Sequence, residues 1–193
     1  SEITLPTGID NEGNQRTAVC CLSSLNLDTY DQWKDDPQFV EDVMRFLDNV
    51  MTDFINKAPD EFAHAKYSAM RERSVGLGVM GLHSYFQQKN IPFGSVMSKV
   101  WNQKIFKHIH KYVDQASKDL AEERGSFPDA ADYGIQERFS NKTAIAPTAS
   151  ISIICGGTSP GVEPIAANSY THKTLSGSFN VRNKYLKKLL AKH

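Results

Sequence analysis

Residues 71–86 read Arg-Glu-Arg-Ser-Val-Gly-Leu-Gly-Val-Met-Gly-Leu-His-Ser-Tyr-Phe. This order is typical of a strand or tight turn that leads directly into a helix. Glycines stand at positions 76, 78 and 81, and glycine at this density lets one backbone segment approach another closely. We therefore expect a strand that packs against neighbouring backbone, followed by a helix that runs towards Ile91.

A long amphipathic helix is predicted before this stretch. Asp35 and Asp36 can cap it, Pro37 stands in its first turn and Pro59 ends it. Its apolar residues share one face at helical spacing, namely Phe39, Val40, Val43, Met44, Leu47, Val50, Met51 and Phe54. We expect the opposite, polar face to be solvated, and it carries Glu41, Asp42, Arg45, Asp48 and Asn49.

A second long helix is predicted after it, capped by Ser95 and ended by Gly125. Its apolar stripe consists of Val96, Val100, Trp101, Ile105, Ile109, Tyr112, Val113, Ala116 and Leu120. Short apolar runs at residues 3–5, 17–22 and 143–146 are predicted as extended segments or strands, with 17–22 buried. Helices that alternate with such runs favour an α/β architecture over a helical bundle.

The composition of the 193-residue chain, with 40% hydrophobic and 23% charged residues, is that of a globular protein. No apolar run approaches the roughly 20 residues that a membrane helix requires. Lys plus Arg and Asp plus Glu both number 22, so no general basic field attracts nucleic acid or an anionic membrane. Three cysteines and no signal peptide predict a reducing, cytoplasmic compartment.

The vicinal pair Cys20 and Cys21 is the first candidate for chemistry. In a strand, adjacent side chains point to opposite faces, so at most one thiol faces a given pocket. Zinc pairs normally use Cys-x-x-Cys spacing, so metal binding is not expected. Two interpretations stay open, an inert buried cysteine and a redox role for one member of the pair.

The histidines do not form a metal site in the sequence. His108 and His110 stand two residues apart, so on a helix they do not share a face, and no further ligand follows at helical spacing. We interpret both as packing or solvated residues. The isolated histidines are interpreted as structural, and these are His64, His83 and His172.

Residues 146–157, Ala-Pro-Thr-Ala-Ser-Ile-Ser-Ile-Ile-Cys-Gly-Gly, are the more informative candidate. A strand leads into Pro-Thr-Ala-Ser and then into a short apolar helix. Hydroxyl groups and free backbone N–H groups therefore gather at a helix N-terminus, where a phosphate fits. An ordinary helix cap by Thr148 or Ser150 explains the same residues equally well.

Taken together, several segments resemble one family, the catalytic large subunit of class I ribonucleotide reductase. They include Ala18-Val-Cys-Cys-Leu-Ser-Ser-Leu-Asn-Leu27 and Val75-Gly-Leu-Gly-Val-Met-Gly-Leu-His83. Six segments stand in the family's order, and they are Ser1–Thr7, Ala18–Leu27, Val75–His83, Ile145–Ser152, Gly161–Pro164 and Tyr170–Leu175. A single segment would be weak evidence, but six in order across the chain are specific.

The resemblance implies a fold of class α/β. The family's catalytic domain is a ten-stranded α/β barrel built from two parallel five-stranded halves, with a finger loop through its middle. Residues 1–193 resemble the second half of that barrel, which is incomplete without the first half. The chain would begin in the finger loop, just after the position of the radical cysteine.

The resemblance also implies an enzyme, a ribonucleoside-diphosphate reductase. Such an enzyme replaces the ribose hydroxyl next to the glycosidic carbon by hydrogen through radical chemistry, and its products serve DNA synthesis. A cobalamin-dependent reductase shares the barrel, but the segments at residues 21–27 and 170–174 look more like class I.

Roles for individual residues follow from the resemblance. The finger-loop pattern is Asn-x-Cys-x-Glu, and Ser1 and Glu2 match its last two places, so Glu2 keeps the position of the base that deprotonates the substrate 3′ hydroxyl. Cys20 matches the second reducing cysteine, whereas Cys21 would be structural and Cys155 would pack in the core. The substrate diphosphate is implied to bind at Pro147, Thr148, Ala149, Ser150 and Ile151.

The Asn and the radical cysteine of the finger-loop pattern would precede Ser1, so we expect the chain to be a fragment that is inactive alone. Three origins stay open: a gene split in the active-site loop, an intein junction, and a polypeptide that has been trimmed. The implied partners are an N-terminal fragment of the large subunit, a small metal-radical subunit, ribonucleoside diphosphate, and thioredoxin or glutaredoxin as the thiol reductant. No cofactor, metal, membrane or nucleic acid is expected to bind this chain.

The alternative hypothesis comes from a different functional class. It is a non-catalytic module for assembly or for nucleotide-phosphate binding, derived from the enzyme, that keeps the phosphate loop without the chemistry. Retention of Glu2 and Cys20 favours the enzyme, because a scaffold needs neither residue.

Overall fold

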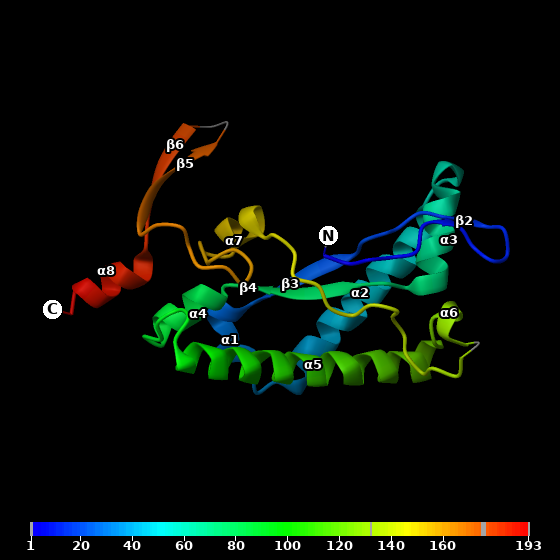
Figure 1. Ribbon diagram of the computed structural model, residues 1–193, viewed down its shortest axis with the longest axis horizontal. Coiled ribbons are helices and arrows are strands. Elements are labelled where there is room, and N and C mark those ends of the chain that lie inside the picture. The colour runs from blue at the N-terminus through cyan, green and yellow to red at the C-terminus, as the bar shows by residue number, and fades with distance from the viewer. Residues whose placement is uncertain (1, 132, 175–176, 193) are drawn as a thin grey trace.

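The computed structural model describes residues 2–131, 133–174 and 177–192 (Figure 1). Its strands are β1 (Gly8–Ile9), β2 (Gln15–Arg16), β3 (Leu22–Asn26), β4 (Gly76–Met80), β5 (Ser169–Thr174) and β6 (Gly177–Arg182). Its α-helices are α1 (Tyr30–Trp33), α2 (Pro37–Lys57), α3 (Ala63–Glu72), α4 (Leu82–Gln88), α5 (Val96–Arg124), α6 (Pro128–Ala131), α7 (Ala149–Ile154) and α8 (Lys184–Leu190). Short 3₁₀ turns, η1 and η2, cover Leu27–Thr29 and Asp60–Phe62. None of the helices in this described part is long and apolar enough to cross a membrane.

The parallel pair β3–β4 lies at the centre of the fold. The two strands pair in register from Leu22 with Gly76 to Asn26 with Met80, and a parallel bridge from Leu77 to Thr143 extends the pair. Figure 1 shows α5 on one side of this pair, and the N-terminal segment and α7 on the other. All five residues of β4 are buried, as expected for a parallel strand covered on both faces.

The predicted glycine-rich strand is confirmed, and its glycines have a steric reason. A Cβ atom at Gly76 would lie 2.7 Å from the Cβ of Ala144 and 2.8 Å from the Cδ1 of Ile3. A Cβ atom at Gly78 would overlap the backbone carbonyl oxygen of Ala144. Any larger residue at these two positions would therefore push the neighbouring segments away from β4.

Both long helices are confirmed with their caps. The Asp36 carboxylate accepts the N–H of Gln38 at the start of α2, and the Ser95 hydroxyl accepts the N–H of Ser98 at the start of α5. Gly125 ends α5. The apolar stripe of α5 is buried only from Ile105 onwards, because its first turns extend beyond the core and leave Val96 and Val100 exposed.

The prediction of a buried strand at residues 17–22 is wrong. Strand β3 begins only at Leu22, and residues 17–21 have no regular secondary structure. The cause is a competing partner, because the N–H of Thr17 donates to the hydroxyl of Ser68 on α3 rather than to a neighbouring strand. The sheet ladder starts where the carbonyl of Cys21 accepts the N–H of Gly76.

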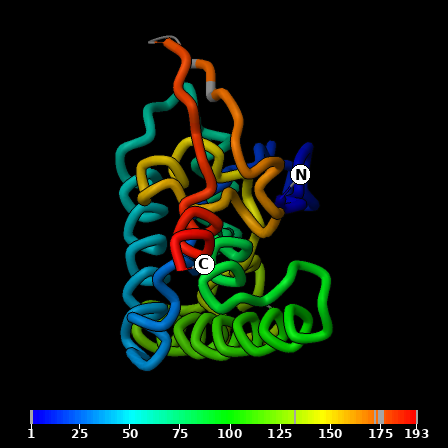
Figure 2. Tube along the Cα trace, turned by 90° about the vertical axis from the view of Figure 1, so that its left-hand side faces the viewer, coloured from blue at the N-terminus to red at the C-terminus, as the bar shows by residue number. Residues whose placement is uncertain are grey.

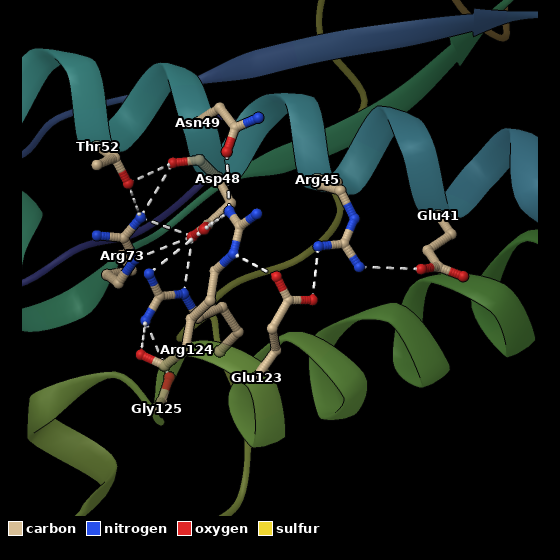
Figure 3. A network of polar contacts seen from close by, with 10 residues as sticks. Glu41, Arg45, Asp48, Asn49, Thr52, Arg73, Glu123, Arg124 and Gly125 are labelled. Carbon is tan, nitrogen blue, oxygen red and sulfur yellow. Dashed lines mark hydrogen bonds and ion pairs between the residues drawn. The ribbon is translucent and has the colours of Figure 1, made fainter.

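The prediction that Asp48 lies on the solvated face of α2 is wrong, because its side chain is fully buried. Its carboxylate accepts hydrogen bonds from Arg73 (2.6 Å), Arg124 (2.9 Å) and Arg138 (2.8 Å). Figure 3 shows this cluster between α2 and the C-terminal end of α5. Helical spacing alone placed Asp48 with the solvated residues, because it does not show where α5 ends against α2.

Asp48 stays ionised in this cluster. Burial by itself would raise the pKa of the Asp48 carboxyl, but the hydrogen bond from Arg138 and the charge of Arg73 outweigh burial, so the pKa lies below its ordinary value. Arg138 is held in turn by the backbone carbonyls of Arg124 and Gly125. One carboxylate thus fixes three guanidinium groups from three parts of the chain.

We predict that Asp48→Ala lowers the free energy of unfolding by about 3–5 kcal/mol, because it leaves buried guanidinium groups without their carboxylate. Urea unfolding measures the loss, and Asp42→Ala on the exposed side of α2 is the control, expected within about 0.5 kcal/mol of the parent chain. Since the pKa of Asp48 is depressed on folding, its contribution is present at neutral pH and is lost as the pH falls below about 4. An equal loss in both variants would contradict this assignment.

Candidate functional site

The N-terminal segment brings Glu2 close to Cys20. Ile3 packs over Gly76 of β4, and the same glycine binds the carbonyl of Cys21 through its N–H group. Burial raises the pKa of the Cys20 thiol, and the nearby charge of Glu2 raises it further. Glu2 therefore lies near enough for its charge to act on Cys20, which stands two residues before β3.

The two vicinal cysteines differ in their surroundings. Cys20 is exposed, whereas Cys21 is half-buried and packs against the hydrophobic core. Exposure alternates along this segment, with Val19 and Cys21 turned inward and Cys20 turned outward. The predicted division between an accessible and a packed thiol is present, although the residues lie outside the strand.

The expected core position of Cys155 is wrong. Cys155 is the C-cap of α7, and its side chain is exposed. The short helix α7 contributes only Ser152 to the buried set, because its isoleucines point largely to solvent. The apolar run at residues 151–154 therefore does not form the packed face that would enclose Cys155.

The loop at residues 147–151 leads into α7 as predicted. Ser150 is exposed at its start, and the backbone N–H groups of Ala149, Ser150 and Ile151 have no acceptor among the described residues. Free N–H groups of this kind favour an anion. The glycines at 156 and 157 turn the chain away from α7 with positive φ angles of 84° and 66°.

The side chain of Thr148 does not cap α7, which was the alternative explanation for the residues of this loop. Its side chain makes no capping hydrogen bond and is almost completely buried. Instead, its hydroxyl accepts the N–H of Gly161 at 2.7 Å. Thr148 therefore holds the segment that follows α7 against the start of α7.

A second polar contact fixes the same segment at its other side, and sequence reasoning missed it. The N–H of Ser84 donates to the hydroxyl of Ser159, and the N–H of Ser159 donates to the hydroxyl of Ser84. The carbonyl of Ser159 also accepts the N–H of Gly81, at the end of β4. Nothing in the spacing of two single serines indicates this pairing.

His83 and His108 make structural contacts, as interpreted from the sequence. The Nδ1 atom of His83 accepts the N–H of Ile165, and burial lowers the pKa of His83. His108 contacts the hydroxyl of Tyr30 at 3.1 Å, whereas His110 is exposed. The side chain of His172 lies outside the described residues. Within the described ranges, no group of three or more His, Cys, Asp or Glu side chains is placed to hold a metal ion.

The candidate site lies on one side of the parallel pair. In Figures 1 and 2 the N-terminal segment and α7 both lie on the side of β3–β4 that faces away from α5. The N-terminal segment thus shares a side of the sheet with α7, whose first N–H groups are free. This arrangement can combine a base, a thiol and an anion-binding loop.

We predict that Glu2→Gln lowers the pKa of Cys20 and increases its alkylation rate by iodoacetamide near pH 8, because removing a nearby negative charge favours the thiolate. Peptide mass spectrometry across a pH series measures the rate for each cysteine. Glu12→Gln, in the turn between β1 and β2, is the matched control. An unchanged Cys20 rate would show that Glu2 does not lie beside it.

We also predict that Thr148→Val exposes the amide of Gly161 to hydrogen exchange and costs about 1–3 kcal/mol, because a buried N–H loses its acceptor. Thr148→Ser keeps the hydroxyl and should retain most of the protection. Exchange measured by mass spectrometry tests both variants, and equal protection in all three chains would contradict the contact.

A family model and several known proteins match most of the chain. The sequence model of the family described as "Ribonucleotide reductase, barrel domain" matches residues 1–137 and 129–193. The ribonucleoside-diphosphate reductase large subunit of Invertebrate iridescent virus 6 is 50% identical over 191 residues, which is 99% of this chain and 19% of that protein. The vitamin B12-dependent ribonucleoside-diphosphate reductase of Thermoplasma acidophilum is 37% identical, over 82% of this chain and 21% of that protein.

A solved structure agrees with these sequences. The class Id ribonucleotide reductase alpha subunit of Actinobacillus ureae superposes with a TM-score of 0.81 at 38% identity, covering 92% of this chain and 32% of that one. The chain thus spans about a fifth to a third of the length of the relatives named here. On this evidence the chain belongs to the ribonucleotide reductase barrel-domain family.

Proposed function

We propose that this chain forms part of the catalytic large subunit of a class I ribonucleotide reductase, which reduces ribonucleoside diphosphates to deoxyribonucleoside diphosphates for DNA synthesis. The observation that carries the proposal is the proximity of Glu2 to Cys20 beside the parallel pair. Family membership supports the same activity.

Glu2 acts as the general base in this proposal. It takes the proton of the substrate 3′ hydroxyl after a thiyl radical has abstracted the 3′ hydrogen, and its exposure leaves the carboxylate open to a substrate. Cys20 and a cysteine from another segment then supply two hydrogen atoms, one to C2′ and one to the 2′ hydroxyl that leaves as water, and become a disulfide. The thiol formed from the thiyl radical returns its hydrogen atom to C3′, which restores the thiyl radical, and Glu2 returns the proton to the 3′ oxygen. Thioredoxin or glutaredoxin reduces that disulfide. The small metal-radical subunit supplies the oxidising equivalent that forms the thiyl radical.

The loop at residues 147–151 binds the substrate diphosphate. The free N–H groups of Ala149, Ser150 and Ile151 and the exposed hydroxyl of Ser150 point to this role. Pro147 sets the entry of the chain into the loop. Thr148 contributes by holding the loop in place, since its buried hydroxyl already accepts a hydrogen bond.

Class I is favoured over a cobalamin-dependent enzyme. Identity to the viral large subunit is 50%, against 37% for the vitamin B12-dependent relative, and the former alignment covers more of the chain. The partners are therefore a polypeptide that carries the rest of the large subunit and a small radical-generating subunit. Three free cysteines agree with a reducing, cytoplasmic compartment.

The test is reconstitution from separately purified parts. We expect deoxyribonucleotide formation only when this chain is mixed with the remaining large-subunit polypeptide and the small subunit. Glu2→Gln should abolish product without preventing the complex, because a neutral amide does not accept the proton. Cys20→Ser should stop multiple turnover with a dithiol reductant, whereas Cys21→Ser should have a mild effect.

Two outcomes would contradict the proposal. Equal behaviour of the Cys20 and Cys21 variants would overturn the assignment of the reducing thiol. A folded chain that ignores both other polypeptides but binds a ribonucleoside diphosphate would favour the non-catalytic binding module.

A further inference from the structure

The N-terminal segment, which we define as residues 2–20, has little regular structure of its own. The structure describes all of it, and only the two-residue strands β1 and β2 pair within it, as an antiparallel hairpin. Gly8 pairs with Arg16 at the open end of this hairpin, and from there one limb runs back to Glu2 and the other runs on to Cys20. A hairpin this short is not stable alone, so the position of its limbs depends on contacts with the rest of the protein.

Arg16 fastens the open end of the hairpin to two helices. The residue is almost completely buried, with 8% of its surface exposed. Its Nη1 atom donates to Glu72 at the end of α3 at 3.2 Å, and its guanidinium group makes a bidentate pair with Asp129 of α6 at 2.5 Å and 3.0 Å. Its Nε atom donates to Asp10 in the hairpin turn at 3.2 Å. One planar guanidinium group therefore joins the hairpin turn, α3 and α6.

The two helix carboxylates depend on Arg16 to stay charged. Burial raises the pKa of Glu72, and the hydrogen bond and charge of Arg16 act in the opposite direction. Burial would also raise the pKa of Asp129, but the hydrogen bond from Arg16 and the charges of Arg16 and Arg71 outweigh burial, so this pKa lies below its ordinary value. Arg71 belongs to the same ionic cluster, and it binds Asp129 at 2.6 Å. Its ion pair joins α3 to α6, whereas the ion pairs of Arg16 also reach the hairpin.

The helix to which the hairpin is fastened is itself held in place. Figure 1 shows β2 beside α3, and the N–H of Thr17, the residue after β2, donates to the buried hydroxyl of Ser68 on α3. Helix α3 ends directly before Arg73, whose guanidinium group binds Asp48 in the core. Arg16 therefore attaches the N-terminal segment to an element whose own position is fixed by the Asp48 cluster.

We propose that Arg16 is a positioning residue, which holds the limb with Glu2 and the limb with Cys20 in the relative position that the reaction requires. The inference rests on the proposed function, because it concerns the base and the reducing thiol assigned there. The ion pairs of Arg16 reach neither of these two residues, so it acts through the hairpin. Lysine would not replace it fully, because one ammonium group does not make the planar bidentate pair with Asp129.

The experiment is a double-mutant cycle between Arg16 and Glu2, with the alkylation rate of Cys20 by iodoacetamide as the readout. In the parent chain we expect Glu2→Gln to increase this rate, because it removes a nearby negative charge. In the Arg16→Gln background we expect this increase to disappear, because the two limbs no longer keep their relative position. Arg71→Gln is the matched control, since it removes a guanidinium group from the same cluster and leaves the hairpin attached. In that background the increase should be retained.

Arg16→Lys keeps the test independent of whether Arg16→Gln folds. It leaves a cation between the buried carboxylates but lacks the bidentate geometry. We expect Glu2→Gln to change the Cys20 rate less in this background than in the Arg71→Gln background. Hydrogen exchange measured by mass spectrometry should be faster than in the parent chain at the amides of β1, β2 and Thr17, while the amides of α5 keep the protection that shows a folded core.

Turnover of the reconstituted reductase is the second readout. We expect Arg16→Lys to lower kcat about tenfold or more and to leave the KM for the ribonucleoside diphosphate nearly unchanged, because the reacting groups are misplaced and the loop at residues 147–151 is not. Absence of product in every mixture would contradict the proposed function alone, since the Cys20 cycle requires no turnover.

Three results would overturn the positioning role. The first is an unchanged Cys20 rate when Glu2→Gln is made in the parent chain. The second is an equal effect of Glu2→Gln in the parent chain and in both Arg16 backgrounds. The third is an equal loss of that effect in the Arg16 and Arg71 backgrounds, which would show that any damage to the ionic cluster has the same result.

Discussion

The buried carboxylate of Asp48 is the constraint on which the arrangement of the main elements depends. It is contributed by α2. Its three guanidinium partners belong to Arg73 at the end of α3, Arg124 in the last turn of α5, and Arg138 in the segment that leads to Thr143. The Asp48 carboxylate can bind all three guanidinium groups only when each of these elements is in its native position. A buried charge that lacks its partners is costly, so the cluster disfavours arrangements in which any one element has moved.

The same cluster explains why Arg73 adopts an unusual backbone conformation. Its φ angle is +44°, in the left-handed region that residues other than glycine rarely occupy. This conformation ends α3 and turns the chain into β4, while the guanidinium group reaches back to Asp48 and Thr52. The hydrogen bonds and the ion pair of this guanidinium group with Asp48, and its hydrogen bond to Thr52, compensate for the local strain.

Some of this fold could be predicted from the sequence, because the signals were local. The caps at Asp36, Ser95 and Gly125 act over one helical turn, and the glycines of β4 reflect a short-range steric need. The features that were missed depend on contacts between distant segments. Asp48 is buried by the end of α5, and residues 17–21 leave the sheet because Thr17 binds Ser68 on α3.

In the candidate site, too, local features could be predicted from the sequence and long-range contacts could not. Exposed and packed thiols at adjacent positions follow from the alternation of an extended chain, and this was predictable. The role of Glu2 came only from family resemblance, since residue type does not distinguish it from a surface carboxylate. At residues 147–151 the sequence indicated an anion site and an ordinary helix cap equally, and the resemblance favoured the first. The contacts of Thr148 with Gly161 and of Ser84 with Ser159 span 13 and 75 residues, and no local pattern encodes them.

Those two contacts bear on how the loop before α7 meets a ligand. Residues 158–161 are attached to the start of α7 through Thr148 and to the start of α4 through Ser84. The loop therefore cannot shift without disturbing the end of β4, and its N–H groups keep their direction when no anion is present. An anion arriving there would meet a preorganised site, and little of its binding energy would be spent on ordering the backbone.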